Sequence, residues 1–249
     1  MIKEKHKLFQ SLRKRETIQE LEFLEPSKLT REQFLADIAK VQNDVLLYVH
    51  GFNNSPDAAT ERVVNLTHRL GFSGMPIVFT WPSHRGEEKG VVADVKGLGW
   101  YLYDLQSANF SRDALFKSLD DLAGLSNVGR IHIVAHSMGS WLTMEALRQA
   151  AIAGRTNILE KVSDVVLLAP DVDAQVFEKQ VASVNTPTPV PVLVFLPGIQ
   201  FFAQASPSAR RFSERIFVFA GSDDWAIGLS SWLSGAPRVG GSPSYSPRA

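Results

Sequence analysis

The sequence predicts an α/β protein with a mostly parallel central sheet and helices on both faces. Short apolar runs recur along the chain, and stretches with apolar residues at helical spacing lie between them. Such runs are typical of strands buried on both faces, and their alternation with helices is typical of a parallel sheet. The 249 residues, 45% of them apolar, can bury one sizeable core. We therefore expect a single domain over residues 1–249.

The regular pattern begins with two expected units. Residues 30–33 (TREQ) have the pattern of a capping box, and apolar residues follow them at helical spacing. Residues 45–50 (VLLYVH) are a bounded apolar run that we expect to be a buried strand. Ser55 then suits the N-cap of a helix, Pro56 its first position and Gly71 its end. Together they predict a strand that leads through a turn into a helix.

Four further apolar runs continue this alternation. One helix is expected to begin at about Ser111. Another is expected to follow residues 130–135 and to end at about Ala153. The runs expected to be strands are 76–81 (PIVFTW), 130–135 (RIHIVA), 165–170 (VVLLAP) and 215–220 (RIFVFA).

Some segments break the alternation. Residues 84–107 hold four glycines and three large aromatic residues without a clear period, so we expect a loop that forms a lid over the carboxyl edge of the sheet. In residues 186–207, a buried strand and an apolar flap both stay open. Residues 1–29 are expected to be an N-terminal arm. Residues 235–249, rich in Gly, Pro and Ser, are expected to be a flexible or truncated tail.

Composition excludes several classes of function. Lys plus Arg equals Asp plus Glu at 26 each, so no net charge favours nucleic acid or an anionic membrane as a partner. The absence of cysteine excludes disulfides, thiolate catalysis and Cys-ligated metals. No H-E-x-x-H, P-loop or G-x-G-x-x-G pattern occurs, so we expect neither metal nor cofactor. A small-molecule substrate fits this composition best.

The expected location follows from the apolar segments. No stretch approaches the roughly 18 apolar residues that span a bilayer, so no integral membrane segment is expected. We expect a cytoplasmic protein, or a secreted or periplasmic one if a leader was removed. The sequence leaves the oligomeric state open.

Ser137 lies where the third expected strand meets a helix. Residues 135–139 (AHSMG) place small residues two before and two after this serine, as a tight strand-to-helix turn needs. Such a turn holds the serine in a strained conformation with its hydroxyl above the sheet and the helix N-terminus behind it. The pattern is A-x-S-x-G rather than the usual G-x-S-x-G. We interpret Ser137 as a nucleophile, and the alternative is a serine that only caps the helix.

A nucleophilic serine in acyl transfer needs hydrogen-bond donors for the developing oxyanion. On such a turn one donor is the amide of the next residue, here Met138. The other comes from the loop after an early strand, where Gly51 allows a sharp turn and leaves the amide of Phe52 as the second donor. We expect His50 to bond to backbone and shape this loop rather than to take part in catalysis.

Several motifs together resemble a bacterial family of α/β-hydrolase-fold serine esterases and lipases, formerly of unknown function. The resemblance covers roughly residues 45–240, and AHSMG itself is similar to the pattern of small bacilli-type lipases. It implies the α/β-hydrolase fold and hydrolysis of carboxylic esters through a serine nucleophile. The motifs are VHGFNNS (49–55), FTWPS (79–83), YLYD (101–104), SRDAL (111–115), AHSMG (135–139), LLAPDVDAQVF (167–177) and GSDDWA (221–226).

The acid of a catalytic triad on this fold follows a late strand. Two turns compete for the role. One holds Asp223 and Asp224, and the family resemblance favours Asp224. The other holds Asp171 and Asp173. Asp171 and Asp223 therefore stay open as alternatives to Asp224, as does the possibility that these carboxylates only cap turns.

The base is the missing member of the triad. It should follow the acid, yet all six histidines precede Ser137. One explanation is that the chain is cut or altered before its last strand, and another is that His84 reaches the site from the expected lid. The third is a hydrolase fold without turnover, which makes a binding or scaffold protein the alternative to a serine carboxylesterase.

Overall fold

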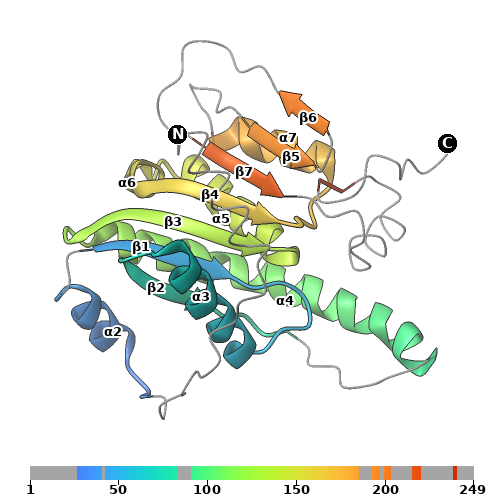
Figure 1. Ribbon diagram of the computed structural model, residues 1–249, viewed down its shortest axis with the longest axis horizontal. Helices are drawn as coiled ribbons and strands as arrows, with labels where there is room; N and C mark the ends of the chain where they lie inside the picture. Colours follow the sequence, from blue (N-terminus) through green and yellow to red (C-terminus); the bar gives the residue numbers. More distant parts are fainter. Residues whose placement is uncertain are drawn as a thin grey trace.

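The computed structural model describes residues 27–40, 43–83, 91–184, 192–196, 199–202, 215–219 and 238–239, with backbone alone for 91–98, 192–196, 199–202 and 215. Within these residues one sheet has the strand order β2-β1-β3-β4-β7-β5-β6 (Figure 1). Neighbouring strands are parallel, except that β6 runs antiparallel to β5. The strands are β1 (Asn43–Val49), β2 (Met75–Phe79), β3 (Val128–His136), β4 (Val162–Leu168), β5 (Val192–Leu196), β6 (Ile199–Phe202) and β7 (Arg215–Phe219).

Helices cover both faces of this sheet, as predicted. Helix α3 packs on one face against β1 and β2, while α4 and α5 pack against each other on the opposite face (Figure 1). The helices are α2 (Arg31–Ile38), α3 (Pro56–Leu70), α4 (Val91–Gly124), α5 (Met138–Ile152), α6 (Thr156–Lys161) and α7 (Ala174–Val184).

The core divides along the two faces of β1. Val45, Leu47 and Val49 belong to the larger cluster under α4 and α5, whereas Leu46 and Tyr48 belong to the smaller cluster under α3. This alternation follows from the two-residue period of a strand. A continuous apolar run is therefore what a strand covered on both faces requires.

The predicted helix ends are confirmed at α2 and α3. The Thr30 side chain accepts from the Gln33 amide, and the Gln33 side chain accepts from the Thr30 amide, which completes the capping box. Ser55 caps α3 through the Ala58 amide, and Pro56 is the first helical residue. Gly71 ends α3 at a φ of 60°, a left-handed conformation that costs glycine little.

The expectation of a long loop over residues 84–107 is wrong from Val91 onward, because α4 begins there and not near Ser111. Tyr101, Ala108 and Leu115 are spaced by seven residues and are all buried in the larger core. Their packing outweighs the cost of glycine in a helix, about 1 kcal/mol for each residue. The amino-terminal part of α4 extends past the carboxyl ends of the strands (Figure 1).

Two other expectations change in the carboxyl-terminal half. Within residues 186–207, the described residues form strands β5 and β6, an antiparallel pair, which agrees with the strand alternative for these residues. Two residues of the expected tail are placed, because Arg238 pairs with Asp173 and the Val239 amide donates to the carbonyl of Val172. Helices α6 and α7 were not expected from the sequence.

Candidate active site

Ser137 occupies the junction between β3 and α5 and has a strained backbone. Its φ is 50° and its ψ is −122°, a conformation that non-glycine residues rarely adopt. Ser137 stands at the N-cap position of α5, but its hydroxyl makes no capping hydrogen bond, so the alternative in which this hydroxyl caps the helix is wrong. The residue is 3% exposed. A strained serine between a strand and a helix is also the local geometry of a nucleophile elbow, and the role of Ser137 as a nucleophile stays a prediction.

Main-chain bonds hold the elbow, defined here as residues 135–139, against the neighbouring strand end. The Ser137 amide donates to the carbonyl of Leu168, and the Ser137 carbonyl accepts from the amides of Ser140 and Asp171. Their donor–acceptor distances are 2.9, 2.9 and 3.2 Å, respectively. These bonds fix the backbone that would carry the Met138 amide.

The loop after β1 lies directly against the elbow. A Cβ atom added to Gly51 would come within 2.9 Å of the Ser137 Cβ, and one added to Gly139 would come within 2.4 Å of the His50 carbonyl oxygen. No side chain larger than hydrogen fits at either position without displacing its neighbours. The predicted need for small residues beside Ser137 is thus confirmed at Gly139, and the structure adds Gly51.

The predicted oxyanion donors belong to these two touching segments. We define the oxyanion loop as residues 51–54, which contains Phe52, while Met138 begins α5. In the part of the chain that the structure describes, the Phe52 and Met138 amides donate no hydrogen bond to another residue. Their role as oxyanion donors stays a prediction.

His50 is buried and structural, as expected. Its Nε2 accepts from the Trp81 amide at 3.2 Å, so Nδ1 carries the proton and donates to the Gly51 carbonyl at 2.9 Å. The imidazole stacks on the Trp81 ring, with 5.0 Å between centroids. Burial lowers the pKa of His50 below its usual value. Both ring nitrogens are used in holding the loop, so His50 is not the base.

Asp104 anchors the same loop and was not expected as a site residue. It is fully buried on α4, and its Oδ2 accepts from the Asn53 amide at 3.2 Å and from the Ser83 hydroxyl at 2.5 Å. Ser83 in turn accepts from the Asn54 amide. The YLYD motif contains this aspartate. Because a loop rather than a helix was expected here, the direction of the Asp104 side chain could not be predicted.

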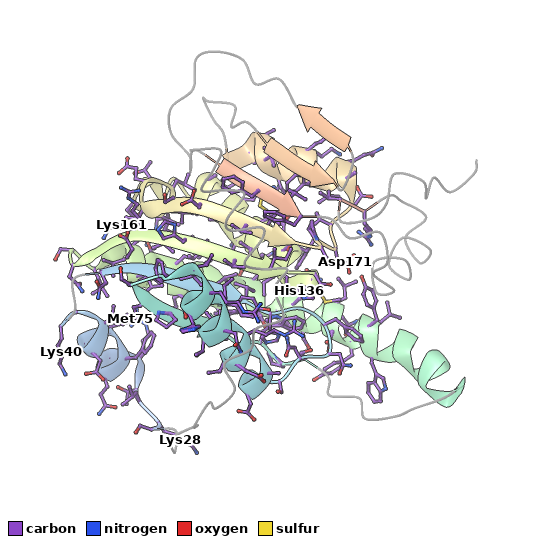
Figure 2. The ribbon with its side chains drawn as sticks, viewed as in Figure 1. Lys28, Lys40, Met75, His136, Lys161 and Asp171 are labelled. Carbon is purple, nitrogen blue, oxygen red and sulfur yellow. The ribbon has the colours of Figure 1, made fainter. Side chains whose placement is uncertain are left out.

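Asp171 is buried beside the elbow and already has partners. Its Oδ2 accepts from the Tyr101 hydroxyl at 2.5 Å, and its Oδ1 lies 3.4 Å from Nε of Arg238. His136 and Asp171 lie at the same end of the sheet (Figure 2). Asp171 as an alternative to Asp224 stays a prediction. Asp223, Asp224 and His84 lie outside the described residues.

The aromatic residues near the elbow and the loop after β1 make different contacts. Trp81 stacks on His50 and donates from its indole to the His50 carbonyl. Tyr101 contacts Phe52, with 5.8 Å between ring centroids, as well as Asp171. Tyr103 points outward and is 50% exposed. Tyr101 and Trp81 thus support the site.

Comparison with known proteins adds the family. A family model described as an α/β hydrolase of unknown function matches residues 27–247. The chain belongs to this family of α/β hydrolases. No curated protein is significantly similar in sequence.

One solved structure similar to this α/β hydrolase is Est1E from Butyrivibrio proteoclasticus with bound ferulic acid. The identity is 13% and the TM-score 0.25, and the match covers 76% of this chain. It spans 61% of the length of the Est1E chain. At this level of likeness, individual residues cannot be matched between the two proteins.

The described residues contain neither a cluster of three possible metal ligands nor a membrane-spanning helix. Within the described ranges, no group of three or more His, Asp or Glu side chains could hold a metal ion. None of the helices that the structure describes is long and apolar enough to cross a bilayer.

Proposed function

We propose that this α/β hydrolase is a serine carboxylesterase that acts on small carboxylic esters. The observation that carries the proposal is the strained backbone of Ser137, whose hydroxyl does not cap the helix that follows. In a folded chain such strain persists where surrounding structure enforces it, and such strained residues cluster at functional sites. The contact of the Gly51 segment with the elbow brings a second set of amides beside this serine.

The proposed reaction has two stages. The Ser137 Oγ attacks the ester carbonyl and passes its proton to the base of the triad, while the Phe52 and Met138 amides stabilise the negative oxygen of the tetrahedral intermediate. The base returns that proton to the departing alkoxide, which leaves as the alcohol and leaves an acyl-serine. The base then takes a proton from the attacking water and gives it to the Ser137 oxygen as the carboxylic acid is released. Asp224 is the proposed acid that orients the base.

The base of this reaction defines the second candidate function. All six histidines precede Ser137 in this sequence, and His50 is already bonded through both ring nitrogens. Loss of the catalytic histidine of a serine-protease triad costs on the order of 10⁶-fold in turnover. That observation favours the rival proposal of a non-catalytic binding or scaffold protein that keeps the hydrolase fold.

A fluorophosphonate probe separates the two functions. Rapid covalent labelling that is lost in Ser137→Ala and kept in Ser118→Ala supports the esterase, since Ser118 lies on α4 with its hydroxyl bonded to the Ala114 carbonyl. Absence of labelling at millimolar probe supports the binding protein. Mass spectrometry of the labelled peptide identifies the modified residue.

Turnover of short p-nitrophenyl esters then tests the individual roles. We expect Ser137→Ala to abolish hydrolysis and Asp224→Asn to lower it strongly, whereas His84→Ala leaves it intact. A Ser137→Ala protein with unchanged turnover contradicts the proposal. A large loss in His84→Ala instead identifies this residue as the base.

A further inference from the structure

Helix α4 reaches both segments that carry the proposed oxyanion amides. Tyr101 and Asp104 are three residues apart, so they project from the same face of the helix. Both are buried at the carboxyl edge of the sheet, although α4 itself runs along one face. One side chain bonds toward the elbow and the other toward the oxyanion loop.

The hydrogen bonds that begin at Tyr101 lead through Asp171 to Ser137, the residue before Met138. The phenol donates to Oδ2 of Asp171 at 2.5 Å, and the Asp171 amide donates to the Ser137 carbonyl at 3.2 Å. The peptide group that contains this carbonyl also contains the Met138 amide. A shift of Asp171 therefore tilts the donor on the elbow.

The hydrogen bonds that Asp104 accepts lead to Asn53, the residue after Phe52. Its carboxylate accepts from the Asn53 amide directly and from the Asn54 amide through the Ser83 hydroxyl. Asn53 has a φ of 50°, which needs support from its surroundings in a non-glycine residue. The carboxylate supplies that support at the position next to the proposed donor.

Because Asp104 is buried, its hydrogen bonds favour one conformation of the oxyanion loop. A buried carboxylate is strongly unfavourable unless it is hydrogen-bonded, and the donors to Asp104 include the loop amide of Asn53 and the Ser83 hydroxyl bonded to that loop. Any loop conformation that withdraws them leaves the charge less well compensated. The aspartate thus favours the conformation in which the loop touches the elbow.

We propose that Tyr101 and Asp104 are positioning residues that set the separation of the Phe52 and Met138 amides. The inference rests on the proposed role of Ser137 as a nucleophile. Oxyanion donors act at about 2.7–3.1 Å from the developing charge, and a misplacement of about 1 Å can cost 10²-fold in rate. Neither side chain needs to touch the substrate, so the loss should affect the transition state more than substrate binding.

The test compares variants of buried and exposed residues on the same helix. Tyr101→Phe and Asp104→Ala are each expected to lower kcat for a p-nitrophenyl ester by about 10- to 100-fold, with KM changed by less than about twofold. The affinity for a boronic acid that mimics the tetrahedral intermediate should fall in parallel with kcat. Asp104→Asn keeps a neutral acceptor and should recover part of the activity.

Matched controls come from the outward face of α4. Tyr103→Phe removes a hydroxyl from a half-exposed tyrosine, and Asp113→Ala removes a carboxylate whose side chain is 68% exposed and pairs with Arg112. Both should keep kcat within about twofold of the original protein. Rates are expressed per site titrated with fluorophosphonate. A lower melting temperature with an unchanged rate per site indicates a purely structural role and overturns the proposal.

The two buried variants should also be coupled. Both act on the separation of the same two amides, so the loss in Tyr101→Phe/Asp104→Ala should be smaller than the product of the single losses. Independent, multiplicative losses contradict a shared effect on one distance.

Hydrogen exchange supplies a test that does not need turnover. Asp104→Ala should speed the exchange of the Asn53 and Asn54 amides, while peptides from α3 exchange as before. Unchanged exchange in the loop overturns the positioning role even in an active enzyme. If the original protein neither hydrolyses esters nor reacts with the probe, the proposed function fails, and the exchange result still decides whether Asp104 holds the loop.

Discussion

Two regions of the sheet each hold a histidine and carboxylates, but these groups make different contacts. At the carboxyl end of β1, beside the elbow, His50 and Asp104 are buried and bond to main-chain groups of tight turns. In the middle of β3, His132 lies 2.7 Å from the Asp164 carboxylate and 3.9 Å from that of Asp44. The side chains of this His132 cluster are between 24% and 43% exposed.

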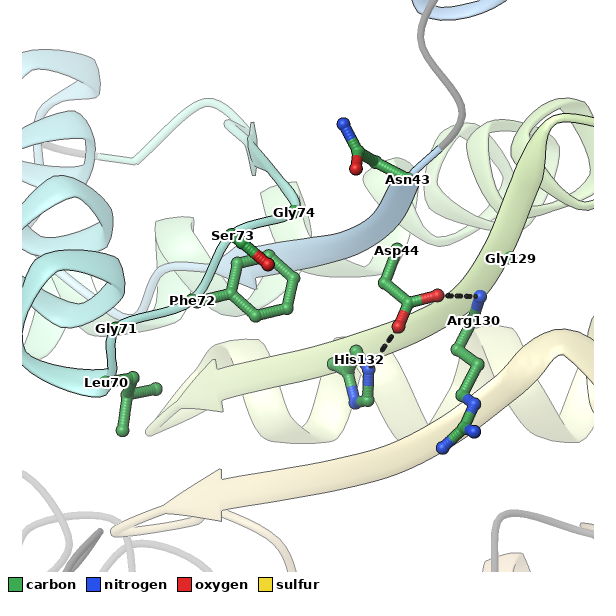
Figure 3. Close-up of a pocket in the computed structure, with 10 residues that line it drawn as sticks. All are labelled: Asn43, Asp44, Leu70, Gly71, Phe72, Ser73, Gly74, Gly129, Arg130 and His132. Carbon is green, nitrogen blue, oxygen red and sulfur yellow. Dashed lines mark hydrogen bonds and ion pairs between the residues drawn. The ribbon is translucent and has the colours of Figure 1, made fainter.

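This difference separates a built site from a surface cluster. Buried polar groups that bond to backbone select one loop conformation, because an unmet hydrogen bond there is costly. Exposed groups that pair with one another contribute little, typically 0–1 kcal/mol. A cavity of about 600 Å³ lies beside His132 and is lined by residues such as Phe72 and Arg130 (Figure 3). Asp44 accepts there from the Arg130 amide at 2.7 Å, but none of the described non-glycine residues that line this pocket has the positive φ of Ser137.

The largest effect is expected when a side chain is added where the elbow contacts the loop after β1. Gly139→Ala places a Cβ 2.4 Å from the His50 carbonyl oxygen and 2.7 Å from that of Val49, both of which are backbone atoms. We expect a loss of roughly 1–3 kcal/mol in unfolding free energy and about 10²-fold in kcat. Urea denaturation and ester hydrolysis measure the two effects.

The matched control for this prediction is another glycine in a helix. Gly99 lies within α4, and a Cβ added there meets nothing within 4 Å. Gly99→Ala should therefore be neutral or stabilising by up to about 1 kcal/mol. Equal behaviour of the two alanine variants contradicts the claim that the elbow and the loop are in contact.

A smaller loss is expected when His50 keeps its ring but loses its nitrogens. His50→Phe retains an aromatic surface against Trp81 and leaves the Gly51 carbonyl and the Trp81 amide without their present partners. The expected loss is about 2 kcal/mol in unfolding free energy, measured with urea. The exposed His68 on α3 provides the control, because His68→Gln should change stability by less than about 0.5 kcal/mol.

The same comparison explains what could be predicted from sequence. The elbow was predictable because Ala135, Ser137 and Gly139 act through local backbone geometry. The helix ends at Thr30, Ser55 and Gly71 were predictable for the same reason. Local chemistry of this kind is visible within a few residues of sequence.

The supports of the site could not be predicted in this way. Asp104 bonds to Asn53, 51 residues away, and Tyr101 bonds to Asp171, 70 residues away. The glycines before Ser111 also concealed the first half of α4, where tertiary packing outweighs helix propensity. The YLYD motif can be recognised in the sequence, but the loop that its aspartate contacts cannot.

The buried His50 should also make stability depend on pH. Its folded-state pKa lies below the value of about 6.5 in the unfolded chain, so the unfolded state binds the proton more readily. The contribution is fully present above pH 6.5 and is lost as pH falls toward the folded pKa. Its slope in that window is at most about 1.4 kcal/mol per pH unit. Urea titrations of the original protein and His50→Phe should show the slope in the former alone, after subtraction of the carboxylate contributions that both share.

The smallest effect is expected in the His132 cluster. His132→Gln removes the contacts with Asp164 and Asp44 but leaves a polar side chain at a partly exposed position. Because such pairs are largely solvated, we expect a loss below about 1 kcal/mol in unfolding free energy and no change in ester turnover. His132 lies five residues before Ser137, about 16 Å along an extended strand, so a contact between their side chains is out of reach. A loss of turnover comparable to that in Asp104→Ala would mean that the His132 cluster and the Ser137 region are coupled, and the partly exposed cluster would then belong to the site.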